Sequence, residues 1–128
     1  MEEEMSRDEY FAWAYDALEE LASREYQRQY WFTENPSDGF STPEEAIHRG
    51  FEDLSMMEQL ESPELSFSDD QKVATRRLDR VLDEFCESHP RPWCRENVFD
   101  DPKWEEVRIA AQALRDLFAP WRDVKRSG

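Results

Sequence analysis

The stretch that decides the fold is residues 68–87, which read SDDQKVATRRLDRVLDEFCE. Ser68 is followed three positions later by Gln71, the spacing of a capping box, in which side chains and backbone at a helix start satisfy one another's hydrogen bonds. Apolar residues then recur at the three- and four-residue spacing of a helix: Val73 or Ala74, Leu78, Val81, Leu82 and Phe85. The pattern predicts an amphipathic helix over residues 69–87.

Three other segments carry helix-start signals of the same kind. Ser6 and Glu9 have the capping-box spacing. Residues 42–45, Thr-Pro-Glu-Glu, combine an N-cap, a proline at the first helical position and a capping glutamate, and Asp101-Pro102 repeats the order of cap and proline. We therefore expect helices to begin at these three points, with Pro120 ending the last of them.

The remaining segments set the limits of the fold. A short helix is predicted over residues 24–32, capped by Ser23, whereas Pro63 prevents one continuous helix through the apolar segment 55–67. The high content of charged residues, 37%, and the presence of only three glycines are typical of a helical protein. We predict an all-α fold, a single-domain bundle of about five helices over residues 1–128, with irregular loops at 33–42, 55–67 and 88–101 and frayed ends at 1–5 and 122–128.

The apolar stripes of these helices predict one hydrophobic core. A chain of 128 residues buries roughly two-thirds of the surface that its unfolded form exposes, which is sufficient for such a core. The residues expected in it are Tyr10, Leu18, Leu21, Tyr26, Trp31, Ile47, Phe51, Leu78, Val81, Leu82, Phe85, Trp104, Val107, Leu114 and Phe118.

The net charge of −15 comes from two blocks of the sequence. Residues 1–20 contain eight acidic side chains and one basic one, and residues 34–70 contain eleven acidic side chains and one arginine. The segments 21–33 and 71–128 each carry a net charge of only +1. Because charge gathered in blocks creates a strong local field, this distribution indicates a surface suited to a cationic partner.

The same charge argues against several other partners. It repels nucleic acids and anionic lipid surfaces, so we expect no nucleic-acid partner and no membrane partner. No apolar run approaches the ~20 residues of a membrane-spanning helix, and the acidic residues 1–4 differ from the basic start of a signal peptide. We therefore expect a cytoplasmic protein. A reducing compartment favours free thiols at Cys86 and Cys94, with a disulfide between them as the alternative.

Two groups of residues have the spacing of metal ligands, but neither group is complete. Glu45 and His48 match the Glu-x-x-His spacing of helical di-iron sites, which need a second such pair that the sequence lacks. Cys86, His89 and Cys94 could supply three zinc ligands, without an evident fourth. The sequence also lacks a G-x-S-x-G motif and a glycine-rich phosphate loop. We expect no cofactor, no metal site and no enzymatic activity.

The acidic block over residues 34–70 is the strongest candidate for a functional surface. Apolar side chains alternate with its carboxylates, and apolar anchors inside a charged rim are typical of tight protein–protein interfaces. The alternative is a solvated surface whose apolar residues belong to the core. The candidate rim is Glu44, Glu45, Glu52, Asp53, Glu58, Glu61 and Glu64, and the candidate anchors are Phe40, Met56 and Met57.

Three short segments share a pattern with known proteins. They are Arg24-Glu-Tyr-Gln-Arg-Gln-Tyr-Trp31, Glu45-Ala-Ile-His-Arg-Gly-Phe-Glu-Asp53 and Pro102-Lys-Trp104-Glu-Glu-Val107-Arg-Ile-Ala-Ala111. The pattern resembles a largely uncharacterised family of small, acidic, all-helical bacterial proteins, which are similar in size and charge to immunity proteins of toxin systems. The resemblance spans residues 7–118, and only the loop at 88–100 departs from it. It implies a helical fold and an immunity role, and it carries over no catalytic or binding residue.

The sequence therefore predicts a non-enzymatic, acidic binding protein. The specific hypothesis is an immunity protein that neutralises a basic toxin by occluding it, with carboxylates standing in for phosphates and accelerating association. One alternative is a nucleic-acid mimic that inhibits a DNA-binding protein. The other is a structural or homo-oligomeric module, whose partner is a second copy of the chain.

Overall fold

The first two helices begin at serine caps. The computed structural model describes residues 6–30, 47, 55–89 and 101–124. Helix α1 spans Arg7–Ala22, and the Ser6 hydroxyl accepts a hydrogen bond from the Glu9 backbone N–H at 3.2 Å while donating one to the Glu9 carboxylate at 3.1 Å. Helix α2 spans Arg24–Tyr30, and the Ser23 hydroxyl accepts a backbone N–H of its first turn at 3.1 Å. Both starts agree with the sequence prediction.

The starts of α5 and α7 also form as predicted. Helix α5 spans Asp69–Ser88, and Ser68 and Gln71 make both hydrogen bonds of a capping box, at 3.1 and 2.8 Å. Helix α7 spans Pro102–Leu117, and the Asp101 carboxylate accepts a backbone N–H of its first turn at 2.8 Å. Side-chain caps of this kind each contribute about 1 kcal/mol to helix stability.

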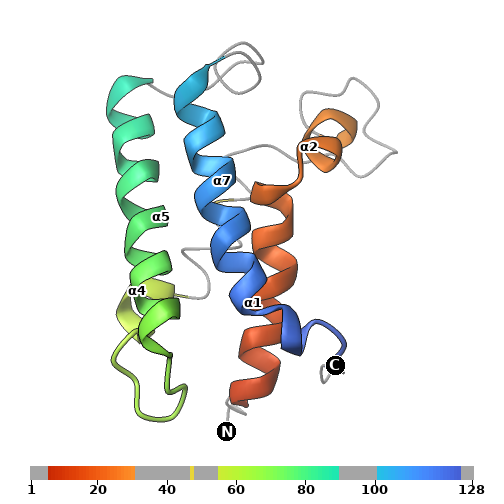
Figure 1. Cartoon of the computed structure of the whole chain (residues 1–128), viewed down its shortest axis with the longest axis vertical. Helices are drawn as coiled ribbons and strands as arrows, with labels where there is room; N and C mark the ends of the chain where they lie inside the picture. The colour runs from red at the N-terminus through yellow and green to blue at the C-terminus, as the bar shows by residue number, and fades with distance from the viewer. Residues whose placement is uncertain (1–5, 31–46, 48–54, 90–100, 125–128) are drawn as a thin grey trace, which may run out of the picture.

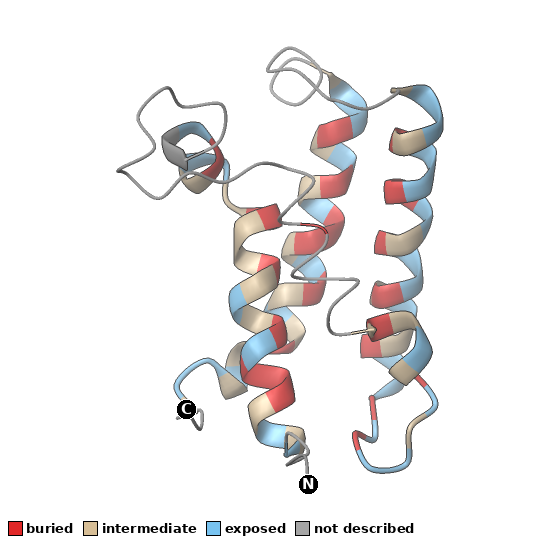
Figure 2. Ribbon diagram, turned by 180° about the vertical axis from the view of Figure 1, so that it is seen from behind, coloured by how far each residue is buried: buried red, intermediate tan, exposed pale blue. Residues whose placement is uncertain are grey.

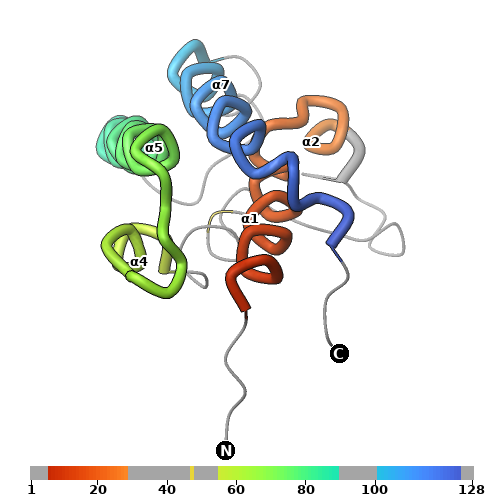
Figure 3. Tube along the Cα trace, turned by 60° about the horizontal axis from the view of Figure 1, so that its bottom comes forward, coloured from red at the N-terminus to blue at the C-terminus, as the bar shows by residue number. Residues whose placement is uncertain are grey.

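Helix α7 lies between α1 and α5 and packs against both (Figure 1). It runs antiparallel to each of them. The short helix α4, Met56–Gln59, lies on the side of α5 away from α7 (Figure 3). The helix α7 ends three residues before Pro120, which falls inside the 3₁₀ helix η3, Ala119–Trp121. All regular elements in the described ranges are helices, which confirms the all-α prediction.

The buried positions of the helices lie on the sides that face one another (Figure 2), and their side chains form one core cluster. Near the start of α1, the Phe11 ring contacts the rings of Phe67 and Phe118, with centroids 5.4 and 5.0 Å apart. Near the other end, the rings of Phe85 and Trp104 meet edge-to-face at 5.1 Å. Each such aromatic pair contributes ~0.5–1.5 kcal/mol beyond the area it buries, so the helices are joined at both ends of the core.

Gln27 is a buried polar residue that the sequence analysis did not identify. Its side-chain N–H groups donate to the backbone carbonyls of Glu20 and Leu21, at 3.0 and 2.8 Å. Its carbonyl oxygen accepts the indole N–H of Trp104 at 3.2 Å. This one side chain therefore satisfies carbonyls at the end of α1 and ties α2 to α7.

The predicted core is largely confirmed. The residues found buried are Tyr10, Leu18, Leu21, Ile47, Leu78, Val81, Leu82, Phe85, Trp104, Val107, Leu114 and Phe118. Tyr26 is half-buried against them, and Trp31 and Phe51 lie outside the described residues. Val73 and Ala74 were the two alternatives for the first core position of α5. Ala74 packs against the core, whereas Val73 is 64% exposed, because the buried side of this turn carries Gln71 and Thr75.

The segment 55–67, predicted to be irregular, contains the single helical turn of α4. Pro63 lies outside that turn, as its missing N–H requires. Ser55, the N-cap residue of α4, and Ser66, after α4, both adopt the left-handed backbone conformation, with φ of 49°. The predicted helix beginning at 42–45, the loop at 33–42 and most of the loop at 88–101 lie outside the described residues.

Candidate interaction surface

Only part of the predicted acidic rim falls within the described residues. Glu58, on α4, and Glu61 and Glu64, which follow it, are all exposed. The other predicted rim residues and one anchor lie outside the described residues: Glu44, Glu45, Glu52, Asp53 and Phe40. Within the described residues, the predicted rim is carried by α4 and the segment after it, and α4 packs against α5.

The structure contradicts the assignment of Met56 as a surface anchor. Met56 is 0% exposed and belongs to the core cluster. Met56 and Leu60 are four residues apart and form the inward face of the single turn of α4, so this turn presents Glu58 outward. Met57 is half-buried at the edge of α4 and remains a candidate anchor.

Glu61 is already neutralised within the molecule. Its carboxylate accepts hydrogen bonds from Lys72 at 3.1 Å and from Arg76 at 3.2 Å, both on α5. The hydrogen bond from Lys72 is the main cause that lowers the pKa of Glu61. Because two cations compete with any partner for this carboxylate, Glu61 is a weaker candidate for the rim than the sequence indicated.

The acidic flank, which we define as Glu58, Asp79 and Asp83, has the opposite character. Asp79 and Asp83 lie four residues apart on one side of α5, and Asp79 is close enough to Glu58 of α4 for the two charges to interact. Partial burial is the main cause that raises the pKa of Asp79, and the charges of Asp83 and Glu58 raise it further. In the part of the chain that the structure describes, no lysine or arginine forms an ion pair with any of these three carboxylates.

The acidic flank also borders the core. Burial is the main cause that raises the pKa of the Tyr10 hydroxyl, and the nearby Glu58 carboxylate contributes to the rise. The sequence analysis missed Asp79 and Asp83 because they belong to a segment with balanced charge. Their spacing places them on one side of a helix, but only the packing of α4 against α5 adds Glu58 to them.

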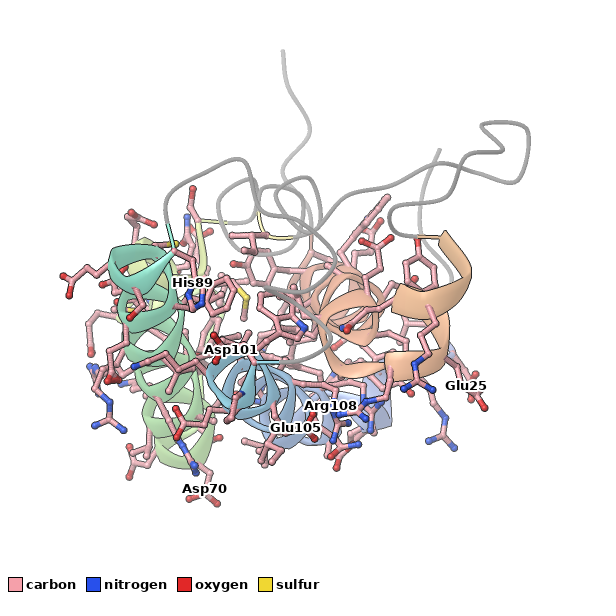
Figure 4. All side chains as sticks on the ribbon, turned by 90° about the horizontal axis from the view of Figure 1, so that it is seen from above. Glu25, Asp70, His89, Asp101, Glu105 and Arg108 are labelled. Atoms are coloured by element: carbon pink, nitrogen blue, oxygen red, sulfur yellow. The ribbon has the colours of Figure 1, made fainter. Side chains whose placement is uncertain are left out.

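The ion-paired seam, which we define as Glu19, Arg24, Glu105, Arg108 and Arg115, joins α7 to α1 and α2. Glu105 accepts hydrogen bonds from Arg108 and Arg24, and Arg108 also donates to the carbonyl of Ala22 at 3.3 Å. Figure 4 shows Glu105 beside Arg108 on α7. The hydrogen bond from Arg108 is the main cause that lowers the pKa of Glu105 to about 2, against an opposing effect of burial. Arg115 holds Glu19 of α1 at 3.1 Å, so the acids of this seam are bound to their own cations.

A groove of about 430 Å³ lies between α5 and α7. It is lined by Arg77, Arg80, Val81, Glu84 and Glu106. Among the lining residues that the structure describes, two guanidinium and two carboxylate groups balance in charge, and none is a cysteine, serine or histidine. This described lining lacks the unbalanced negative charge of the acidic flank.

Of the residues with metal-ligand spacing, only Cys86 and His89 fall within the described part of the chain. Both ring nitrogens of His89 are engaged, one with Asp101 at 2.5 Å and the other with the carbonyl of Phe85 at 3.2 Å. Cys86 is a half-buried free thiol, and Cys94, Glu45 and His48 lie outside the described residues. Across residues 6–30, 55–89 and 101–124, no three histidine, cysteine or acidic side chains form a group able to hold a metal ion.

The last two findings concern membrane-spanning helices and similarity to known proteins. Among the helices described, none combines the length and the apolar character that crossing a bilayer requires. Comparisons of the chain with protein-family models, with curated proteins and with solved structures find no match. The resemblance to suspected immunity proteins thus stays a prediction, and the functional argument depends on the surface itself.

Proposed function

We propose that this protein is a non-enzymatic binding protein whose acidic flank docks on a basic protein, and that its role is to neutralise a toxin by occluding it. The observation that carries the proposal is the gathering of Glu58, Asp79 and Asp83, for which no lysine or arginine among the described residues forms an ion pair, next to a core that partly buries Asp79. Like charges held together in this way cost folding free energy. A cationic partner would remove that cost on binding.

The contrast with Glu61 and Glu105 supports this interpretation. Those two carboxylates, on the same molecule, have cations within hydrogen-bond distance, so the chain does not lack bases to place beside acids. Met57, which precedes Glu58 in the sequence and is half-buried against the core, is the candidate apolar contact residue. An acidic surface with an apolar neighbour fits a basic groove such as that of a nuclease, and electrostatic steering can raise the association rate by ~10–10³-fold at low salt.

The direct test uses the product of the adjacent gene as the candidate toxin. Its expression alone should arrest growth, and co-expression of this chain should restore it. A triple variant, Glu58→Gln, Asp79→Asn and Asp83→Asn, is expected to lower the association rate at low salt about tenfold and to weaken the rescue. The matched control removes the same number of charges elsewhere, through Asp16→Asn, Glu25→Gln and Asp123→Asn.

The outcomes separate the proposal from its alternatives. Equal losses in the two triple variants would reduce the effect to net charge and overturn the assignment of the acidic flank. Competition with DNA for several unrelated basic proteins would identify a nucleic-acid mimic, because an immunity protein binds a single cognate toxin. Self-association in sedimentation without any added protein would support the homo-oligomeric alternative instead.

A further inference from the structure

Arg7 contacts three separate parts of the chain. It is the first residue of α1, and its Nε donates a hydrogen bond to the backbone carbonyl of Leu65 at 2.7 Å. Its guanidinium carbon lies 4.6 Å from the centre of the Phe11 ring and 5.3 Å from the ring of Trp121, which belongs to η3. One side chain therefore joins α1 to η3 and to the segment that follows α4.

The surroundings of Arg7 offset an unfavourable position for a cation. The start of a helix carries the positive pole of its dipole, so a base in the first turn is disfavoured there. Two aromatic rings and one carbonyl oxygen act in the opposite direction, because the face of an aromatic ring attracts a cation and the carbonyl accepts an N–H. A guanidinium group suits this site better than an ammonium group, because it is planar and can stack on rings while it donates.

Trp121 is held against α1 by contacts of its own. Its indole N–H donates to the Asp8 carboxylate at 2.9 Å, and its ring meets the Phe11 ring edge-to-face, with centroids 4.8 Å apart. Figure 1 shows η3 beside the start of α1. We define the η3 latch as Arg7, Asp8, Phe11 and Trp121. Removing the Trp121 ring would open one side of Arg7 to water, and water would then compete for its hydrogen bond to Leu65.

The segment that Arg7 holds is continuous with α4. Three successive backbone hydrogen bonds, each 3.0 Å long, join residues 55–66 into one run of turns. Glu58 lies in the first of these turns and Leu65 lies in the last. Because each turn begins at the residue where the previous one ends, a restraint on Leu65 also restrains the turn that carries Glu58.

We propose that Arg7 is a positioning residue, which the η3 latch holds in place so that it fixes the segment 55–66 and, through it, the Glu58 charge of the acidic flank. Burial of Met56 and Leu60 keeps α4 on the core, and the latch restricts the turns that follow α4. Any event that draws Trp121 away from α1 therefore loosens the acidic flank. The consequence for partner binding rests on the proposed function, whereas the coupling itself is a property of the protein alone.

The test follows hydrogen exchange by NMR at the three amides that donate the backbone hydrogen bonds of segment 55–66, in the protein without a partner. Trp121→Leu and Arg7→Ala should each accelerate exchange at these amides about tenfold. Trp121→Phe keeps a ring and loses the indole N–H, so it should give a smaller increase. The control is Tyr26→Leu, which removes a half-buried aromatic ring from α2. It should weaken the fold as a whole without accelerating exchange at these three amides.

A double variant, Arg7→Ala with Trp121→Leu, separates coupling from a sum of independent effects. Because Trp121 acts on the segment through Arg7, the double variant should exchange no faster than the Arg7→Ala protein. Additive increases would overturn the proposal, and so would equal acceleration of the three amides in the control and the latch variants. If the latch variants accelerate exchange but keep the full association rate with the candidate toxin, the coupling is confirmed and the failure lies with the proposed docking surface.

Discussion

The ion-paired seam and the acidic flank both place carboxylates against the helices of the bundle, but in opposite surroundings. In the seam, Glu105 lies between two guanidinium groups, and its pKa falls to about 2. In the flank, Asp79 faces Asp83 and Glu58, and its pKa is raised. Ionisation therefore stabilises the fold at the seam and costs folding free energy at the flank. Contacts within the fold account for the acids of the seam, whereas the acids of the flank form the proposed docking surface.

The largest effect is expected from Gln27, the buried residue that links α2 to α1 and α7. Replacing Gln27 with leucine removes three hydrogen bonds, two to backbone carbonyls and one from the indole N–H of Trp104. A buried hydrogen bond contributes ~0.5–1.5 kcal/mol, so we expect a loss of about 3 kcal/mol in the free energy of unfolding, measured by urea denaturation. The control is Arg28→Leu, an exposed position in the same helix, and it should change the stability by less than ~0.5 kcal/mol. Equal stability of the parent and the Gln27 variant would show that this link does not hold α2.

The second prediction sets the two regions directly against each other. Arg108→Gln removes the main partner of Glu105 and should destabilise the protein by about 1 kcal/mol, a figure reduced because the pair is partly exposed. Asp83→Asn removes a like charge from the acidic flank and should stabilise the protein by ~0.5 kcal/mol. Both are measured by urea denaturation at low salt. The same sign for the two changes would contradict the comparison.

The third prediction concerns pH. The folded pKa of Glu105 is depressed, so its contribution to stability is present above its usual value of 4.5 and is lost as the pH falls toward about 2. The folded pKa of Asp79 is raised, so its charge costs stability at neutral pH, and that cost disappears as the pH falls through the folded pKa. The Glu105→Gln variant should therefore lose its difference from the parent in acid. The Asp79→Asn variant should be the more stable protein at pH 7 and lose that advantage in acid. Thermal unfolding from pH 2 to 7 measures both trends.

The smallest effect is expected at Glu61. Its side chain is 72% exposed, so water and salt screen its pairs with Lys72 and Arg76. We expect Glu61→Gln to shift the urea midpoint slightly at low salt and not at all at 0.5 M salt. A large shift of the urea midpoint at 0.5 M salt would mean that the ion pairs of Glu61 stabilise the fold as those of the ion-paired seam do.

The helices could be predicted because their starts depend on neighbours in the sequence. Ser6, Ser68 and Asp101 each accept a backbone N–H two or three residues along the chain, so residue type and spacing are sufficient to locate them. The all-α fold followed from these caps together with the apolar stripes between them. Val73 was the weak point on α5, because apolar character alone does not fix which side of a helix is buried.

The candidate site could not be predicted in the same way, because it depends on contacts between distant segments. The charge of Glu58 acts on Asp79 only because α4 packs against α5. Glu61 is neutralised by bases more than ten residues away in the sequence. Met56 has the composition of an interface residue, and its burial follows from the inward face of a single turn.

The brevity of α4 has a consequence for every experiment on the acidic flank. A helix of four residues has no stability of its own, so α4 keeps its place through the burial of Met56 and Leu60 in the core. The position of the Glu58 charge thus depends on the buried side chains of Met56 and Leu60. A substitution at Met56, far from any water, would move an electric field on the outside of the molecule.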